Sequence, residues 1–248
     1  MGMNEHTSKQ FEAELEATCT RVLQMGGLVE AQIRAAIDGF TEGDEQLLAR
    51  VVADDHRVNA YEVSIDEACA QLIARRQPAA GDLRLIMAIS KIVTDLERIG
   101  DEAEKVARMS KSVHERGFQP AHRFPGVRHA GTEAIAMLRK SLDAFARRDA
   151  ETAAEVLAQD PAIDNEFRSV LRQLITFMME DPRTIRRSLD SMWVVRALER
   201  IGDHAKNICE YVIYVVHGKD VRHTRLEDVA RELQPAGAPQ VTAGAQKS

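Results

Sequence analysis

The six-residue segment Leu-Glu-Arg-Ile-Gly-Asp occurs twice in this sequence, at residues 96–101 and again 102 residues later at 198–203. Each copy holds two carboxylates four residues apart, Glu97 with Asp101 and Glu199 with Asp203. On a helix this spacing places both carboxylates on one face. Neighbouring carboxylates repel each other, so a pair that occurs at the same place in both copies suggests that a positive charge lies against it.

Further oxygen-bearing side chains interrupt the apolar stripe of the helix that precedes each copy. In the first half they are Asp55, Asn59 and Glu62, and in the second half they are Asp160 and Asp164. An inward-facing charge is costly unless it is paired, bound to a metal or close to an opening. Because both helices of each half carry such residues, we expect two acidic ridges to meet in each half.

Four oxygen donors at close range suit a hard or borderline cation. The ridges contain little histidine or thiol, so a Cys/His zinc site is not expected. A simpler alternative is that Glu97 and Asp101 form ion pairs with Arg98 or with another arginine, since surface ion pairs are common. Gly100 and Gly202 lie within predicted helices and indicate either close helix packing or room for an ion beside each ridge.

Pro161 lies between Asp160 and Asp164. It is expected either to kink its helix or to begin a new one with Asp160 as the N-cap. In the second case Asp160 would use part of its oxygens as a cap, and the second site would lose a ligand. The first site has the neutral Asn59 instead, with Glu62 available nearby, so the two sites are not expected to be equivalent.

The elements that carry these residues follow from apolar periodicity and helix-breaking residues, which predict six helices. Their expected ranges are 11–40, 45–76, 82–114, 129–147, 150–180 and 184–217. Residues 1–10 are expected to form a loose lead-in, and a short helix is expected at 226–233. The first two helices of the halves align at an offset of 105 and the third at 102, with the difference placed at the loops around Pro78 and Pro182.

This repeat predicts an all-α fold of two tandem three-helix bundles related by a pseudo-twofold. We expect a first bundle at 1–117, a linker at 118–128, a second bundle at 129–217 and a tail at 218–248 that is largely disordered at its end. The composition agrees with a helical fold, because 44% of the 248 residues are hydrophobic and only 4% are aromatic. The net charge of −6 argues against a general nucleic-acid binder. Three cysteines without CxxC spacing and an N-terminus without an apolar signal segment favour a cytoplasmic location.

The sequence resembles the PhoU family, the accessory proteins of phosphate-specific transport. The twin segments at 96–101 and 198–203 carry the resemblance, together with residues 58–69, 76–84 and 178–181, and the similarity spans about residues 8–225. The resemblance implies two three-helix bundles, with metal sites on the paired acidic motifs. The expected ligands are Asp55, Asn59, Glu62, Glu97, Asp101, Asp160, Asp164, Glu199 and Asp203. The expected cofactor is a divalent or multinuclear metal, namely iron, zinc or magnesium.

The resemblance also implies a function without catalysis. PhoU-like proteins are adaptors between the ATPase of a phosphate ABC transporter and a phosphate-sensing histidine kinase, they repress the phosphate-starvation response, and they are often homodimers. One alternative is a ferritin-like carboxylate metal oxidase or metal-storage bundle. That chemistry usually requires Glu-x-x-His motifs, and the sequence offers only Asp220-x-x-His223. The other is a structural scaffold whose carboxylates form salt bridges.

Overall fold

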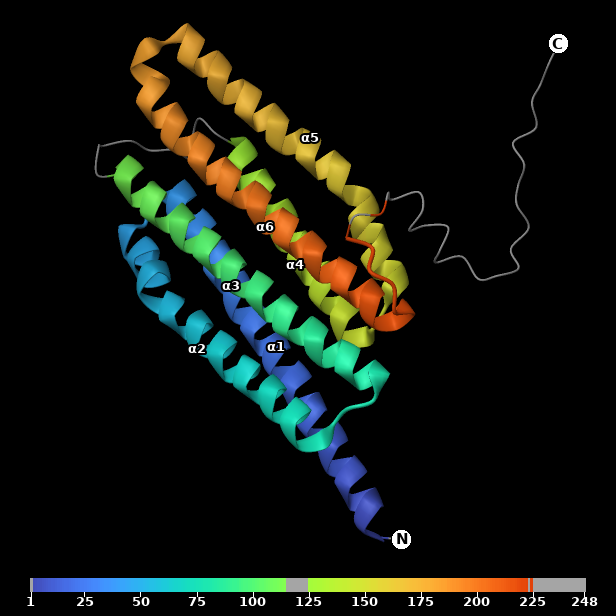
Figure 1. The fold of residues 1–248 in the computed structure, drawn as a ribbon. Coiled ribbons are helices and arrows are strands. Elements are labelled where there is room, and N and C mark those ends of the chain that lie inside the picture. The colour runs from blue at the N-terminus through green and yellow to red at the C-terminus, as the bar shows by residue number, and fades with distance from the viewer. Residues whose placement is uncertain (1, 115–124, 223, 225–248) are drawn as a thin grey trace, which may run out of the picture.

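The computed structural model describes residues 2–114, 125–222 and 224. These residues form long helices and no strand, and they run side by side as two three-helix bundles (Figure 1). The first bundle comprises α1 (Gly2–Glu42), α2 (Glu45–Arg76) and α3 (Ala80–His114). The second comprises α4 (Pro125–Arg147), α5 (Ala150–Glu180) and α6 (Ile185–His217), with a short 3-10 helix η2 (Pro182–Thr184) before α6. The all-α prediction of two tandem bundles is confirmed.

Local sequence signals set most helix ends. The Asp44 side chain accepts hydrogen bonds from the backbone N–H of Gln46 and Leu47 at 3.0 and 2.9 Å, which caps the start of α2. Asp149 caps α5 in the same way through the N–H of Thr152 at 2.9 Å. Helix α4 begins at Pro125 rather than at residue 129, because proline is well suited to the first helical position.

The structure corrects the prediction for residues 1–10 and decides between the two alternatives for Pro161. The loose lead-in is wrong at residues 2–10, which belong to α1; residues 3–10 contain neither glycine nor proline, so nothing in them breaks a helix. Helix α5 continues through Pro161, so Asp160 is not an N-cap. The predicted linker at 118–128 is wrong at residues 125–128, which belong to α4. Residues 115–124, the short helix predicted at 226–233 and the predicted disordered end of the tail lie outside the described residues.

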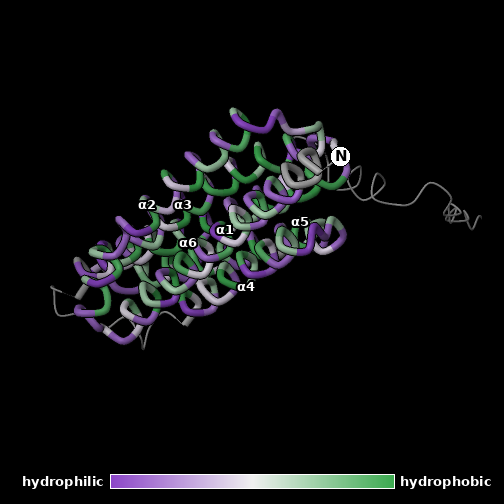
Figure 2. Tube along the Cα trace, turned by 90° about the horizontal axis from the view of Figure 1, so that it is seen from below, coloured by the Kyte–Doolittle hydropathy of each residue, from purple (hydrophilic) through white to green (hydrophobic). Residues whose placement is uncertain are grey.

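One core joins the two bundles. Buried apolar residues from all six helices form a single cluster, and Figure 2 shows them where the helices face one another. Helix α3 packs along α6, and α1 packs against α4. Among the described helices, none has an apolar stretch long enough to cross a membrane.

Two glycines mark the close approach of α1 and α4. A Cβ atom on Gly26 would lie 2.6 Å from Leu142, and one on Gly131 would lie 2.2 Å from Ile37. These are the same contact under the pseudo-twofold, because 26 and 131, like 37 and 142, are separated by the repeat offset of 105. The two first helices therefore pack closely in a symmetric way.

Replacing Gly131 with leucine should destabilise the protein by about 1–3 kcal/mol, since overpacking at this contact forces α1 and α4 apart. The expected change is a fall in melting temperature of about 2–12 °C for a chain of this size. Gly27→Leu is the matched control, because no atom of the described residues lies within 4 Å of a Cβ at Gly27. Equal melting temperatures for the two variants in thermal circular dichroism would contradict the close packing.

Candidate metal centre

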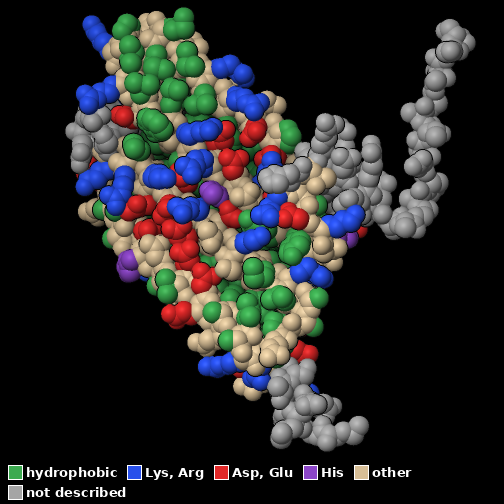
Figure 3. All heavy atoms as spheres, in the orientation of Figure 1, with side chains coloured by type: hydrophobic (Ala, Val, Ile, Leu, Met, Phe, Trp, Pro, Cys, Tyr) green, Lys and Arg blue, Asp and Glu red, His purple; other side chains and the backbone are tan. Residues whose placement is uncertain are grey.

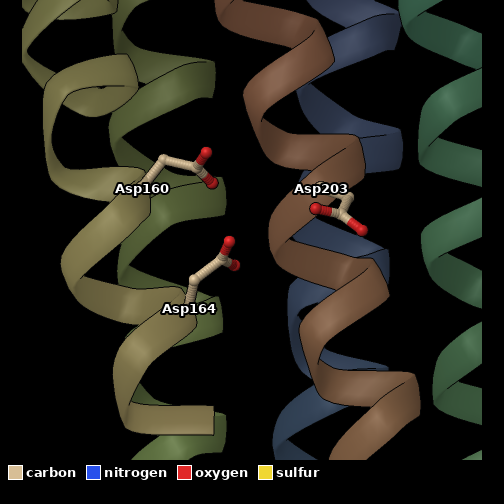
Figure 4. Close-up of side chains that lie close together, drawn as sticks. All are labelled: Asp160, Asp164 and Asp203. Carbon is tan, nitrogen blue, oxygen red and sulfur yellow. The ribbon is translucent and has the colours of Figure 1, made fainter. Parts of the chain in front are cut away.

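Three aspartates of the second bundle converge between α5 and α6. Asp160 and Asp164 point from α5 towards Asp203 on α6 (Figure 4). Each offers a carboxylate oxygen, and these oxygens all lie within 4.8 Å of one another. Asp160 is buried, Asp164 is half-buried and Asp203 is exposed. We call Asp160, Asp164 and Asp203 the second acidic cluster; its spacing is close enough to hold a cation.

The second acidic cluster already contains a positive charge from the protein. The Lys206 ammonium group donates a hydrogen bond of 2.5 Å to Asp160 Oδ2. Burial alone would lower the pKa of Lys206, but the hydrogen bond and the charges of Asp160, Glu210 and Asp203 outweigh it and raise the pKa. Asp203 is exposed as a whole residue, but neighbouring side chains remove part of the water around its carboxyl group. This raises the pKa of Asp203, and the charges of Glu199 and Asp160 raise it further.

The first bundle carries a set of five carboxylates on the corresponding helices, α2 and α3, although among the described residues only the second acidic cluster brings three carboxylate oxygens within 4.8 Å of one another. We call Asp55, Glu62, Glu97, Asp101 and Glu104 the first acidic cluster. Burial raises the pKa of Asp55, and the charges of Glu104 and Asp101 raise it further. Burial likewise raises the pKa of Glu97, followed by the charges of Asp101 and Glu62. The carboxylates of the cluster therefore repel one another, in addition to the effect of burial.

Two exposed arginines offset part of that repulsion. Arg108 lies 2.6 Å from Glu104 Oε1, and its side chain is 60% exposed. Arg98 lies 3.5 Å from Glu97 Oε2 and 3.6 Å from Asp101 Oδ2, and its own side chain is 55% exposed. Such open ion pairs contribute little. The predicted salt-bridge alternative is therefore present in the first bundle, but it neutralises the cluster only weakly.

Unpartnered atoms lie beside the first acidic cluster. Asp55 Oδ1 and both amide atoms of Gln32 are buried and lack a hydrogen-bond partner within the described residues. Gln32 is 5% exposed. A Cβ on Gly100 would lie 3.5 Å from Gln32 Oε1 and 3.6 Å from Asp55 Oδ1, so both oxygens face the space beside this glycine. Because buried polar atoms without partners are costly, the donor set fits a cation that binds oxygen.

The remaining predicted ligands are less central. Asn59 is exposed and donates a 3.4 Å hydrogen bond to Asp55 Oδ2, so its amide supports Asp55. Glu199 accepts a 2.5 Å hydrogen bond from Arg196. Glu62 is half-buried, and burial raises its pKa, as does the charge of Asp66. Gln32 and Lys206 were not among the predicted ligands, although Gln32 is a polar interruption in the apolar stripe of α1.

Comparison with known proteins decides the family. The PhoU domain matches residues 22–110 and again residues 127–212. The chain belongs to the PhoU family. It is 50% identical over 232 residues to the phosphate-specific transport system accessory protein PhoU homolog of Pseudomonas putida, an alignment that covers 94% of this chain and 90% of the relative. It is 45% identical to PhoU of Escherichia coli K12, with 94% and 96% of the two chains covered.

Solved PhoU structures share the fold. The crystal structure of PhoU from Pseudomonas aeruginosa superposes with a TM-score of 0.80 at 50% identity and covers 84% of this chain and 100% of that one. The regulatory protein PhoU from Streptococcus pneumoniae gives a TM-score of 0.78 at 26% identity, over 85% and 99%. The ferritin-like alternative is not favoured by these relatives. In addition, Asp220 of the Asp220-x-x-His223 motif is ion-paired with Arg222, whose Nε lies 2.9 Å away.

Proposed function

We propose that this PhoU protein is a non-enzymatic regulator of phosphate uptake and of phosphate-starvation signalling. It acts in the cytoplasm as an adaptor between the ATPase of a phosphate ABC transporter and a phosphate-sensing histidine kinase, and it represses the response when phosphate is ample. The observation that carries the proposal is the PhoU domain match in both halves of the chain. The names of the relatives, which associate them with the phosphate-specific transport system, support it.

The face formed by α3 and α6 is the surface best suited to the transporter ATPase. Hydrophobic side chains gather at both ends of this face, with charged side chains between them (Figure 3). Leu83 and Met87 of α3 are 39% and 47% exposed, and their counterparts in α6, Ile185 and Leu189, are 43% and 45% exposed. Trp193, one turn further along α6, is 62% exposed. Exposed apolar patches of this kind mark protein contacts.

The first acidic cluster is proposed to hold the metal. Asp55, Glu97 and Asp101 supply carboxylate oxygens, and Gln32 supplies an amide oxygen. Iron, zinc or magnesium bound there would add to the positive charge that the exposed Arg98 and Arg108 side chains supply only in part. Oxygen donors of this kind suit a hard or borderline cation.

Arg98 connects the metal site to the partner surface. Its guanidinium group contacts Glu97 and Asp101 and also lines the groove between α3 and α6, together with Asp95, Arg200 and other residues. Once the two carboxylates are neutralised by another cation, Arg98 is free to turn towards the groove. The charge state of the cluster would thereby change the face that the partner meets.

The adaptor proposal is tested by co-purification of the transporter ATPase and the kinase with the tagged protein at high and low phosphate. Retention of both partners is expected for the wild type. Leu189→Glu combined with Trp193→Glu should abolish retention of the ATPase, while Thr132→Glu, at an exposed position on α4, should not. Failure of the wild type to retain either partner would refute the proposal. Light scattering on the same sample tests the proposed homodimer, which has twice the 27.6 kDa mass of one chain.

A further inference from the structure

Lys206 distinguishes the second acidic cluster from the first. Its ammonium group crosses from α6 to α5 and lies 2.5 Å from Asp160 Oδ2. The Asp160 side chain is 11% exposed and that of Lys206 is 33% exposed, so the contact is largely shielded from water. The most buried carboxylate of the second acidic cluster is therefore already neutralised by the chain itself.

The repeat shows what stands at this position in the other bundle. The offset of 102 between the third helices places Lys206 on Glu104. The first acidic cluster thus has a carboxylate where the second has an ammonium group. Glu104 is paired with Arg108, but Arg108 is 60% exposed and makes no hydrogen bond to the other carboxylates of the cluster.

The residues beside Gly100 and Gly202, the glycines of the repeated segment, also make the first cluster better suited to a cation than the second. The offset of 105 places Met137 on Gln32. A Cβ on Gly202 would lie 3.4 Å from Met137 Sδ, whereas a Cβ on Gly100 would lie 3.5 Å from Gln32 Oε1. The first bundle therefore offers an oxygen donor at this point and the second offers a thioether, which hard cations do not prefer.

We infer that Lys206 is a built-in counter-ion that closes the second acidic cluster to divalent cations, so that this chain holds metal at the first acidic cluster alone. The inference rests on the metal site proposed above. It makes the second cluster a latent site, with three converging carboxylates that become available when the ammonium group is removed. The two bundles of similar fold would then have different roles. The first bundle binds a cation, and in the second the α5–α6 contact is held by Lys206 without a metal ion.

The test counts Mn²⁺ bound to the metal-free full-length protein by electron paramagnetic resonance and calorimetry. Lys206→Glu introduces the residue that the first repeat has at the equivalent position, Glu104. It should about double the number of bound Mn²⁺ ions. Lys140→Glu is the matched control, because Lys140 is an exposed lysine whose ammonium group contacts Gln159 and, among the described residues, no carboxylate. Adding Asp160→Asn to Lys206→Glu should remove the extra binding.

A second variant covers the case in which Lys206→Glu does not fold. Lys206→Met removes the charge without adding one, and Mn²⁺ should raise its melting temperature through the second cluster, even when Asp55→Asn and Glu97→Gln remove the first site. A wild type that binds as many Mn²⁺ ions after those two substitutions as before would overturn the inference. So would folded Lys206 variants that gain no binding.

The outcomes separate this inference from the proposed metal site. In one outcome, the wild type binds Mn²⁺ and loses it with Asp55→Asn and Glu97→Gln, but the Lys206 variants bind no additional Mn²⁺. This outcome refutes the latent site and leaves the first site intact. A gain in the Lys206 variants with no binding by the wild type supports the role of Lys206 and refutes the first site.

Discussion

Replacing Asp95 with alanine should lower the melting temperature of this protein by about 4–12 °C. Asp95 lies on α3 at the contact with α6 and is 7% exposed. Its Oδ1 atom lies 2.6 Å from His204 Nδ1 and accepts a 3.0 Å hydrogen bond from Asn207 Nδ2. Alanine would leave these two half-buried partners without this acceptor, at a cost of about 2–3 kcal/mol. Each kcal/mol corresponds to about 2–4 °C at this size.

The experiment is a thermal melt followed by circular dichroism, with the neighbouring Thr94→Ala as the control, because Thr94 is exposed. A double-mutant cycle with His204→Ala should show a coupling of about 1 kcal/mol or more between the two side chains. Additive effects of the two substitutions would show that the contact does not join the bundles. The result matters for function because Asp95 and His204 line the α3–α6 groove on the proposed partner surface.

The sequence predicted the helices well because their signals are local. Asp44 and Asp149 act as N-caps, a position that aspartate favours, and the two proline-containing loops separate the second and third helices of each bundle. Pro161 was harder to judge, since proline removes one backbone hydrogen bond but does not always end a helix. Here buried residues on both sides, Leu157 and Ile163, hold α5 against the core.

The site was predicted only in part, because its composition depends on contacts between helices. The spacing of residues within each helix predicted which face of α5 carries Asp160 and Asp164 and which face of α6 carries Asp203. These three side chains do converge. The spacing could not predict that Lys206 reaches Asp160, since this contact depends on the register of α6 against α5. The role of Gln32 was hidden for the same reason: only the packing of α1 against α3 places its amide beside Gly100.

Neutralising two residues of the first acidic cluster should affect stability and metal binding in opposite directions. In Asp55→Asn combined with Glu97→Gln, the affinity for Mn²⁺ should fall by at least about 100-fold, because two charged ligands are lost. The metal-free variant should nevertheless be more stable than the metal-free wild type at neutral pH, by about 1 kcal/mol, since like-charge repulsion is relieved. A variant made less stable by these substitutions would show that the carboxylates serve the fold rather than a ligand.

The pH dependence of this difference follows from the raised pKa values of Asp55 and Glu97. A group whose folded-state pKa is raised binds protons more tightly when folded, so its contribution to stability is present below the unfolded carboxyl pKa, near 4, and is lost as the pH rises through the folded value. The difference between variant and wild type should therefore be largest at neutral pH and should vanish towards pH 4. Urea unfolding across this range measures it.

A matched control and a metal titration complete the design. Asp54→Asn combined with Glu12→Gln removes the same charge from positions outside the cluster and should change neither quantity appreciably. In the wild type, Mn²⁺ at 100 times its dissociation constant should stabilise the fold by about 2.7 kcal/mol, and in the Asp55→Asn, Glu97→Gln variant the same concentration should stabilise it little. The carboxylates of the first acidic cluster would then weaken the metal-free fold and stabilise the metal-bound one, so that metal occupancy and the packing of α2 against α3 are thermodynamically linked.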